Sequence, residues 1–177
     1  MTLHGQRCTL RRWRTADAPS LVRHANNINV AKYLRDRFPH PYTHADAESF
    51  LLVASTAQPQ TNFAIDVGSQ AIGGLGYVPG HDVERYSAEV GYWLAEECWG
   101  RGITTDALIV FANYAFAELR LLRLFALPLA ENTASIRVLE KAGFELEGTL
   151  RASCVKYGER RDQAMYAKVN AQWLPPR

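Results

Sequence analysis

Hydrophobic and polar positions along the first part of the chain predict one strand followed by three helices. Residues 7–13 alternate in part and are typical of a strand, and Thr15 is expected to cap the helix that follows. A second helical segment is predicted at residues 30–34, and Thr43 is expected to cap a third helix. The two prolines in residues 38–42 exclude regular helix in that segment.

The rest of the chain shows mainly the shorter periodicity of strands, interrupted by two helical stretches. We predict helices at residues 102–119 and 132–142, and strands at residues 63–67, 71–77, 87–95, 121–129, 144–150 and 163–169. The strand at 71–77 is rich in glycine, as expected where another backbone or a ligand comes close. The strand at 121–129 is apolar on both faces apart from Arg123, which predicts cover on both sides. The order β-α-α-α-β-β-β-α-β-α-β-β predicts an α/β protein with a mixed sheet and helices on its faces.

Composition narrows the class of protein. The 177 residues suit one domain, which we expect to span residues 1–177, and the 47% hydrophobic and 21% charged residues are typical of a soluble globular protein. No run approaches roughly 20 apolar residues, and no basic stripe interleaved with aromatic residues appears, so neither a membrane span nor nucleic-acid binding is predicted. The three cysteines are widely spaced, which predicts a reducing, cytoplasmic compartment. Pro41 interrupts the pair His40 and His44, so no metal site is predicted.

The junction between a strand and the longest helix is a candidate anion site. Trp99-Gly100-Arg101-Gly102-Ile103 places two glycines where the first amides of a helix have no intrahelical partner. Taken alone, these residues fit a tight strand-to-helix turn equally well. The P-loop pattern is absent from the sequence, and Thr105 occupies the place of the third glycine of a dinucleotide-binding motif.

Two longer segments carry a family resemblance. Residues 88–94 followed by residues 99–107 resemble the central motif of the GNAT acyltransferase superfamily. Residues 131–144 resemble the next motif as it occurs in the Rim-type, ribosomal-protein N-acetyltransferase branch, and the resemblance extends in order from Leu10 to Val169. It implies the GNAT fold: a mixed, mostly antiparallel sheet with helices on both faces and a splay between the fourth strand, residues 88–94, and the fifth, residues 121–129.

The same resemblance implies acetyl-CoA as co-substrate, without a metal. It assigns the pantetheine and thioester to backbone groups of Trp93 and Leu94, and a pantetheine hydrogen bond to Asn132. It assigns the pyrophosphate to backbone amides around Trp99, Gly100, Arg101, Gly102, Ile103 and Thr104. One position departs from the family pattern, because Glu97 stands where the superfamily usually has Gln or Arg.

Direct acetyl transfer requires a neutral amine and a proton for the leaving thiolate. Glu89 is the candidate base, acting directly or through a water, and its alternative is an ion pair with a nearby arginine. Ser135 is a candidate acid, although its hydroxyl also suits the amides at a helix start; Tyr157 and water are the other candidates. Leu139 occupies the position at which many superfamily members carry a tyrosine acid.

The acceptor is expected beside the segment between the early helices. The resemblance places the acceptor near Tyr33, Arg35, Pro41 and Tyr42, and the alternative is a loop packed over the core. The acceptor predicted from the Rim-type resemblance is a protein N-terminal α-amine. A small amine such as an amino acid, polyamine or antibiotic, and a non-catalytic acetyl-CoA-binding module, are the alternatives. An exposed C-terminal edge strand suggests a homodimer.

Overall fold

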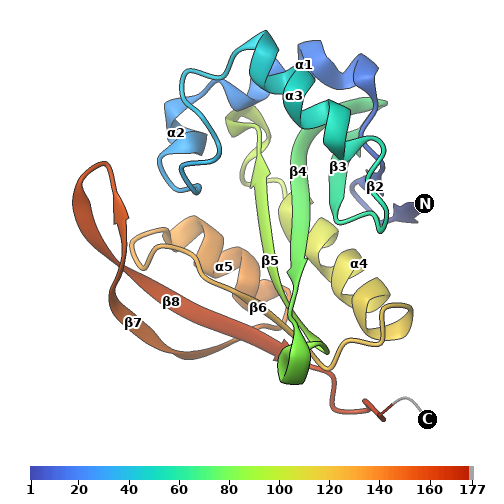
Figure 1. The fold of residues 1–177 in the computed structure, drawn as a ribbon, viewed down its shortest axis with the longest axis vertical. Coiled ribbons are helices and arrows are strands. Elements are labelled where there is room, and N and C mark those ends of the chain that lie inside the picture. Colours follow the sequence, from blue (N-terminus) through green and yellow to red (C-terminus); the bar gives the residue numbers. More distant parts are fainter. Residues whose placement is uncertain (176–177) are drawn as a thin grey trace. The chain divides into compact units, whose positions relative to one another are not determined.

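Eight β-strands and five α-helices follow one another in residues 1–175, which this computed structural model describes (Figure 1). Their order is the predicted one, with an additional short strand, β1, at the start. The chain forms two compact units. The first comprises Met1–Gly76 and Tyr92–Ala107, and the second comprises Tyr77–Gly91 and the described chain from Leu108 onward.

The strands form a mixed, mostly antiparallel sheet in the order β1-β2-β3-β4-β5-β6-β8-β7. The pairs β1–β2, β2–β3, β3–β4, β6–β8 and β7–β8 are antiparallel, whereas β5 and β6 are parallel. The parallel ladder joins residues 87–89 to residues 123–125, and β5 runs on to Leu94. The fold class predicted from the sequence, the GNAT fold, is confirmed.

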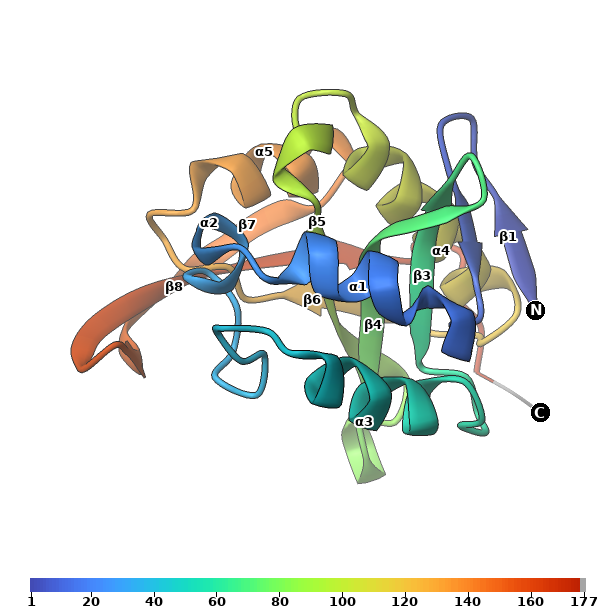
Figure 2. The ribbon, with the colours of Figure 1, turned by 90° about the horizontal axis from the view of Figure 1, so that it is seen from above.

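The first unit combines an antiparallel sheet with three short helices. Its elements are β1 (Thr2–His4), β2 (Thr9–Arg11), α1 (Ala18–Ala25), α2 (Ile28–Ala31), α3 (His44–Ala54), β3 (Asn62–Val67) and most of β4 (Gln70–Pro79). Figure 2 shows α1 and α3 side by side over β3 and β4. Trp13 is the largest side chain of the core between them, which also contains Leu21, Leu51, Ala64 and Ala71.

Two sequence features of the first unit act as predicted. Thr43 caps α3: its hydroxyl accepts a hydrogen bond from the amide of Asp46, and the Asp46 carboxylate accepts one from the amide of Thr43 at 2.8 Å. Gly73 lies where another backbone comes close, because a Cβ at this position would lie 2.5 Å from the carbonyl oxygen of Trp93. Glycine therefore permits the contact between β4 and the end of β5.

The second unit places α5 against a sheet formed by the last strands. Its elements are parts of β4, β5 (Ser87–Leu94) and α4 (Ile103–Ala117), together with β6 (Arg123–Ala126), α5 (Thr133–Lys141), β7 (Glu145–Lys156) and β8 (Glu159–Val169). Tyr166 and Lys168 of β8 donate hydrogen bonds to the Glu140 carboxylate at 3.2 Å and to the Ala142 carbonyl at 2.8 Å, respectively. Gly143 ends α5 at a φ of +79°, the left-handed conformation expected of a glycine that follows a helix.

Three predicted details are wrong. Thr15 does not cap a helix: it is the first residue of a 3₁₀ turn, Thr15–Asp17, because Asp17 accepts the amide of Arg14 and the guanidinium of Arg11. The strand predicted at residues 121–129 has four residues, and its burial alternates because Arg123 and Phe125 line a pocket. The last two strands, β7 and β8, are longer than predicted.

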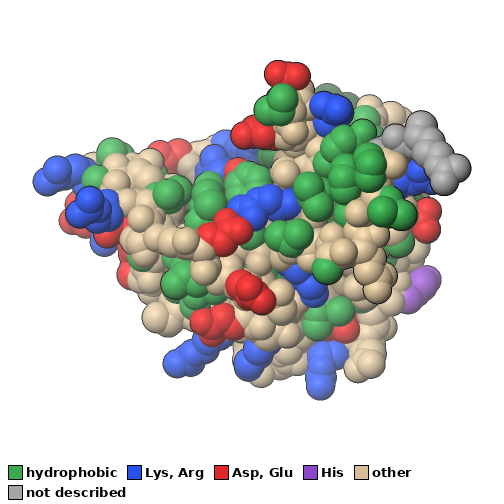
Figure 3. All heavy atoms as spheres, turned by 90° about the horizontal axis from the view of Figure 1, so that it is seen from below, with side chains coloured by type: hydrophobic (Ala, Val, Ile, Leu, Met, Phe, Trp, Pro, Cys, Tyr) green, Lys and Arg blue, Asp and Glu red, His purple; other side chains and the backbone are tan. Residues whose placement is uncertain are grey.

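Charged side chains of both signs occur together on one face of the protein (Figure 3). The face shown in Figure 3 mixes acidic and basic side chains among hydrophobic ones. Within the described residues, no helix is both long enough and apolar enough to cross a bilayer.

Candidate functional site

The loop that opens α4 has the backbone conformation of an anion site. Gly100 and Gly102 have φ values of +74° and +73°, a left-handed region that favours glycine. The helix begins at Ile103, and the amide of Asp106 bonds to the carbonyl of Gly102 at 3.0 Å. The amides of the first helical turn therefore have no partner within the helix, and the helix dipole adds positive potential at this end.

Trp99 fixes this loop to the end of β5. Its indole nitrogen donates a hydrogen bond of 2.8 Å to the carbonyl of Leu94, while the side chain stays 43% exposed. Leu94 and Ile103 are buried, so their contribution to a ligand is limited to backbone groups. The side chain of Arg101 is exposed in the loop, and Thr104 is half-buried.

The acceptor segment of the sequence prediction reaches the end of β5 through aromatic contacts. The ring of Phe38 packs against Trp93 with centroids 5.5 Å apart and against Tyr42 with centroids 5.2 Å apart. Tyr42 is 5% exposed, its backbone amide donates to Asn26 at 3.0 Å, and burial, aided by the nearby Asp46 carboxylate, raises its pKa to about 12. These contacts favour a packing role for Tyr42 and identify Phe38 as the side chain next to Trp93.

The other predicted acceptor residues lie on the same segment with different exposure. Tyr33 is half-buried beside the ammonium of Lys32, which is 5.2 Å from the ring centroid. Arg35 and Pro41 are exposed. Their contact with an acceptor stays a prediction.

Glu97, at the position where the resembled family usually has Gln or Arg, is engaged within the first unit. Its carboxylate lies 3.6 Å from Arg23 and 3.6 Å from the Nδ1 of His24. The His24 ring is buried, and this burial lowers its pKa despite the nearby Glu97 carboxylate. Glu97 therefore contacts basic groups of its own unit.

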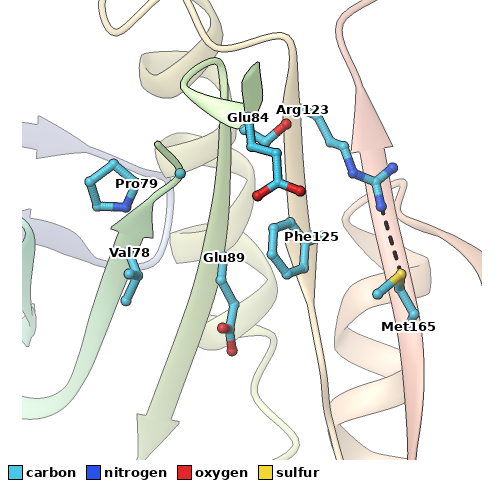
Figure 4. Close-up of a pocket in the computed structure, with 9 residues that line it drawn as sticks. Val78, Pro79, Glu84, Glu89, Arg123, Phe125 and Met165 are labelled. Atoms are coloured by element: carbon cyan, nitrogen blue, oxygen red, sulfur yellow. Dashed lines mark hydrogen bonds between the residues drawn. The ribbon is translucent and has the colours of Figure 1, made fainter. Parts of the chain in front are cut away.

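Glu89 lines a pocket of about 300 Å³ in the second unit. Figure 4 shows Glu89 projecting from β5, with Val78 and Pro79 at one side of the pocket and Arg123 and Met165 at the other. Glu84 and Phe125 also line the pocket, and Phe125 is the register partner of Glu89 on β6. The pocket thus combines two carboxylates with an aromatic ring, a composition that suits a cation.

The positive charge in this pocket is compensated from outside it. Both terminal nitrogens of Arg123 donate hydrogen bonds to the carboxylate of Glu147, which does not line the pocket. These bonds hold the pKa of Glu147 below its usual value. The charge of Arg123 is thus offset by Glu147, and the lining of the pocket also carries the two carboxylates Glu84 and Glu89.

Asn132 and Ser135 also lie in the second unit, at the start of α5. The side-chain oxygen of Asn132 accepts the amide of Ser135 at 3.1 Å and caps the helix. The hydrogen-bond donors of an Asn side chain are on its nitrogen, so a cap made by the oxygen leaves the nitrogen of the same side chain for a ligand. The cap and the predicted cofactor contact are therefore compatible.

The cysteines contribute packing. All three are free, and Cys8 and Cys98 are buried. Burial, with a further contribution from the Asp106 carboxylate, raises the pKa of Cys8 to about 12, so its thiol is protonated at neutral pH. No group of three or more metal-binding side chains occurs within the described part of the chain.

Sequence reasoning missed the pocket residues Glu84, Arg123, Phe125 and Met165. They come from separate segments, the 3₁₀ turn Asp82–Glu84 and the strands β6 and β8, so no local motif identifies them. The arginine inside the otherwise apolar stretch 121–129 was the one available signal.

Comparison with known proteins gives consistent matches. The acetyltransferase (GNAT) domain model matches residues 7–145. The chain is 30% identical to the uncharacterized N-acetyltransferase p20 of Bacillus licheniformis over 178 residues, 97% of this chain and 98% of that protein. It is 26% identical to spermidine N(1)-acetyltransferase of Escherichia coli strain K12 over 155 residues, 84% of this chain and 78% of that enzyme. Mycobacterium smegmatis RimJ, solved with CoA-disulfide, has a TM-score of 0.83 at 28% identity, covering 99% of this chain and 90% of its own.

Proposed function

This chain belongs to the GNAT family of N-acetyltransferases, and on that premise we propose that it transfers the acetyl group of acetyl-CoA directly to a primary amine. The observation that carries the proposal is the pair of left-handed glycines, Gly100 and Gly102, at the start of a 15-residue helix. This geometry presents backbone amides to an anion without an intervening side chain, as a CoA pyrophosphate requires.

The donor is held mainly by backbone. Amides around residues 99–104 take the pyrophosphate, and backbone groups of Trp93 and Leu94 meet the pantetheine arm. Trp99 supports both contacts, because its bond to the Leu94 carbonyl joins the loop to the strand. The donor end of the Asn132 side chain bonds to the pantetheine while the acceptor end caps α5.

Glu89 acts as the general base, directly or through one water. It takes a proton from the acceptor ammonium, and the neutral nitrogen attacks the thioester carbonyl. The C–N bond then forms and the C–S bond breaks. The nitrogen gives up its second excess proton as the leaving thiolate takes up a proton, and Glu89 returns the first proton to solvent. Ser135 is the candidate donor of the proton that the thiolate takes up. The support for Glu89 is its position on β5, in a pocket that a second carboxylate, Glu84, and the ring of Phe125 also line.

The acceptor is a protein N-terminal α-amine. The support is the resemblance of residues 131–144 to the motif of the Rim-type, ribosomal-protein N-acetyltransferase branch. A small polycationic amine is the second candidate. The pocket of about 300 Å³ with Glu84 and Glu89 favours it, as does the similarity to a spermidine acetyltransferase.

Thiol release from acetyl-CoA tests both acceptors. Wild-type protein is offered N-terminal peptides, spermidine, free amino acids and aminoglycosides in parallel. Turnover of peptides alone supports the α-amine, and turnover of spermidine alone supports the second candidate. Binding of acetyl-CoA without turnover of any acceptor would show a non-catalytic acetyl-CoA-binding module and contradict the proposal.

Replacement of Glu89 by Gln tests the base. We expect the rate to fall by about 10²–10⁴-fold, most strongly at low pH where the amine is protonated. Acetyl-CoA affinity should stay intact, and Glu118→Gln, which removes a carboxylate from an exposed site, is the matched control. A pH–rate profile identical to that of the wild type would exclude Glu89 as the base.

We further propose a homodimer that acts in the cytoplasm. Strand β7 ends the sheet, and its Leu146 and Val155 are 56% and 62% exposed, which suits pairing with β7 of a second copy. Sedimentation velocity should give a dimer that Val155→Glu dissociates, whereas a wild-type monomer would refute the pairing. The three free cysteines support a reducing compartment, and localisation of a tagged chain to any other compartment would contradict it.

A further inference from the structure

The turn between β1 and β2 is attached to the first turn of α4. The carboxylate of Asp106 accepts the backbone amides of Gln6 at 3.2 Å, Arg7 at 2.7 Å and Cys8 at 3.3 Å. Gly5 completes this contact, because a Cβ there would lie 2.3 Å from an Asp106 oxygen. The position of the turn is therefore set by a residue of α4, the helix whose first turn belongs to the proposed pyrophosphate site.

This attachment places the side chain of Arg7 beside the glycine loop. A Cβ built on Gly102 would lie 3.4 Å from the Nε of Arg7 and 3.9 Å from its Cζ. The guanidinium thus lies alongside the backbone that opens α4. The fixed amide of Arg7 limits where this long side chain can go, so the proximity follows from the turn.

Arg7 differs from the neighbouring arginines in how its charge is used. Arg11 is bound to Asp17 and Asp66, and Arg12 donates to the carbonyls of Ser55 and Ala57. Arg7 is exposed, and no acidic side chain within residues 1–175 forms an ion pair with its guanidinium. A cation at the positive end of a helix is unfavourable unless an anion joins it.

The family position for a polar or basic side chain in this loop holds a carboxylate here, which repels a phosphate. Glu97 occupies it, and its carboxylate lies against Arg23 and His24. A phosphate at the loop would therefore find its side-chain cations elsewhere, at Arg101 within the loop and at Arg7 beside it. Arg7 comes from a segment remote in sequence, which hides it from motif analysis.

We propose that the guanidinium of Arg7 binds a phosphate group of acetyl-CoA and so serves as a donor-binding residue supplied by the β1–β2 turn. This inference rests on the proposed function, since it takes acetyl-CoA as the donor. The planar guanidinium presents two parallel N–H donors that fit two phosphate oxygens, a fixed geometry that the ammonium of a lysine lacks. The pyrophosphate and the 3′-phosphate are the two groups that this guanidinium could bind, and the experiment below distinguishes between them.

Calorimetric titration with CoA and with 3′-dephospho-CoA tests the proposal. Arg7→Gln should weaken CoA binding by about tenfold, the effect of one charge-assisted hydrogen-bonded contact. Arg7→Lys should recover part of that loss. In steady-state assays the KM for acetyl-CoA should rise while kcat stays near the wild-type value. The wild-type affinity should also fall more steeply with salt than that of Arg7→Gln.

The two ligands identify the phosphate. Weaker binding of both by Arg7→Gln assigns the contact to the pyrophosphate, and weaker binding of CoA alone assigns it to the 3′-phosphate. Arg151→Gln, which removes an exposed arginine from β7, is the control and should bind as the wild type does. Unchanged thermal unfolding of Arg7→Gln shows that the fold is kept.

Two outcomes would overturn the inference, and they are distinguishable. If the wild type binds CoA and Arg7→Gln binds it within twofold, the Arg7 contact is wrong and the proposed function stands. If the wild type binds neither ligand, the donor assignment itself fails and the Arg7 contact fails with it.

Discussion

Replacing Gly100 or Gly102 by alanine should destabilise the protein to the same extent, because the two glycines share one backbone conformation although their surroundings differ. Their φ values are +74° and +73°, and an alanine in the left-handed region costs about 1–2 kcal/mol. A Cβ on Gly100 would meet nothing within 4 Å, and one on Gly102 would come no closer than 3.4 Å to the flexible end of Arg7. The free energy of unfolding should therefore fall by about 1–2 kcal/mol in each variant, from backbone strain alone.

Urea denaturation of the ligand-free protein measures this loss. Gly100→Asn provides an internal comparison, because asparagine tolerates the left-handed region better than alanine. The expected order of stability is wild type, then Gly100→Asn, then Gly100→Ala. An alanine variant as stable as the wild type would show that the loop relaxes to another conformation, and the argument for a preformed anion site would fail.

Two further predictions concern the first unit. Burial raises the pKa of Cys8 from an ordinary 9.0 to about 12 in the folded protein. The unfolded chain therefore loses the thiol proton at lower pH than the folded protein does. The free energy of unfolding should fall as pH rises from about 9 towards 12. Urea denaturation at pH 8 and pH 10.5 should show this loss in the wild type and a smaller one in Cys8→Ala; equal losses would refute it. Asp17→Ala leaves the buried Arg11 guanidinium without two of its hydrogen bonds, of 2.8 and 2.9 Å, and should lower the free energy of unfolding by about 3–5 kcal/mol. A loss below about 1 kcal/mol, the effect expected for the exposed control Glu118→Ala, would contradict that reasoning.

The parts of the fold that the sequence predicts are those determined locally. Thr43 with Asp46 forms a capping box within four residues, and Gly143 ends α5 because the chain must turn there. The cap predicted at Thr15 is wrong because the Asp17 carboxylate forms an ion pair with Arg11. The other partner of Arg11 is Asp66, which is distant in sequence. No local pattern contains that competition.

The same distinction holds for the candidate site. The glycine loop before α4 is contiguous, so its residues could be identified from sequence, and the structure gives both glycines the conformation that an anion site needs. The pocket around Glu89 depends on the pairing of Glu89 with Phe125, and the position of Arg7 depends on Asp106. Both require contacts between distant segments, which periodicity does not report.

The bond between Gln6 and Asp106 joins residues 100 positions apart, which has a consequence for the order of folding. The turn at residues 5–8 emerges early in synthesis, yet the carboxylate that holds it follows about 100 residues later. Closing such a long loop carries an entropic cost that is recovered only when the native contact forms. We therefore expect the β1–β2 turn to become ordered late, and loss of Asp106 to speed unfolding more than it slows the earlier steps of folding.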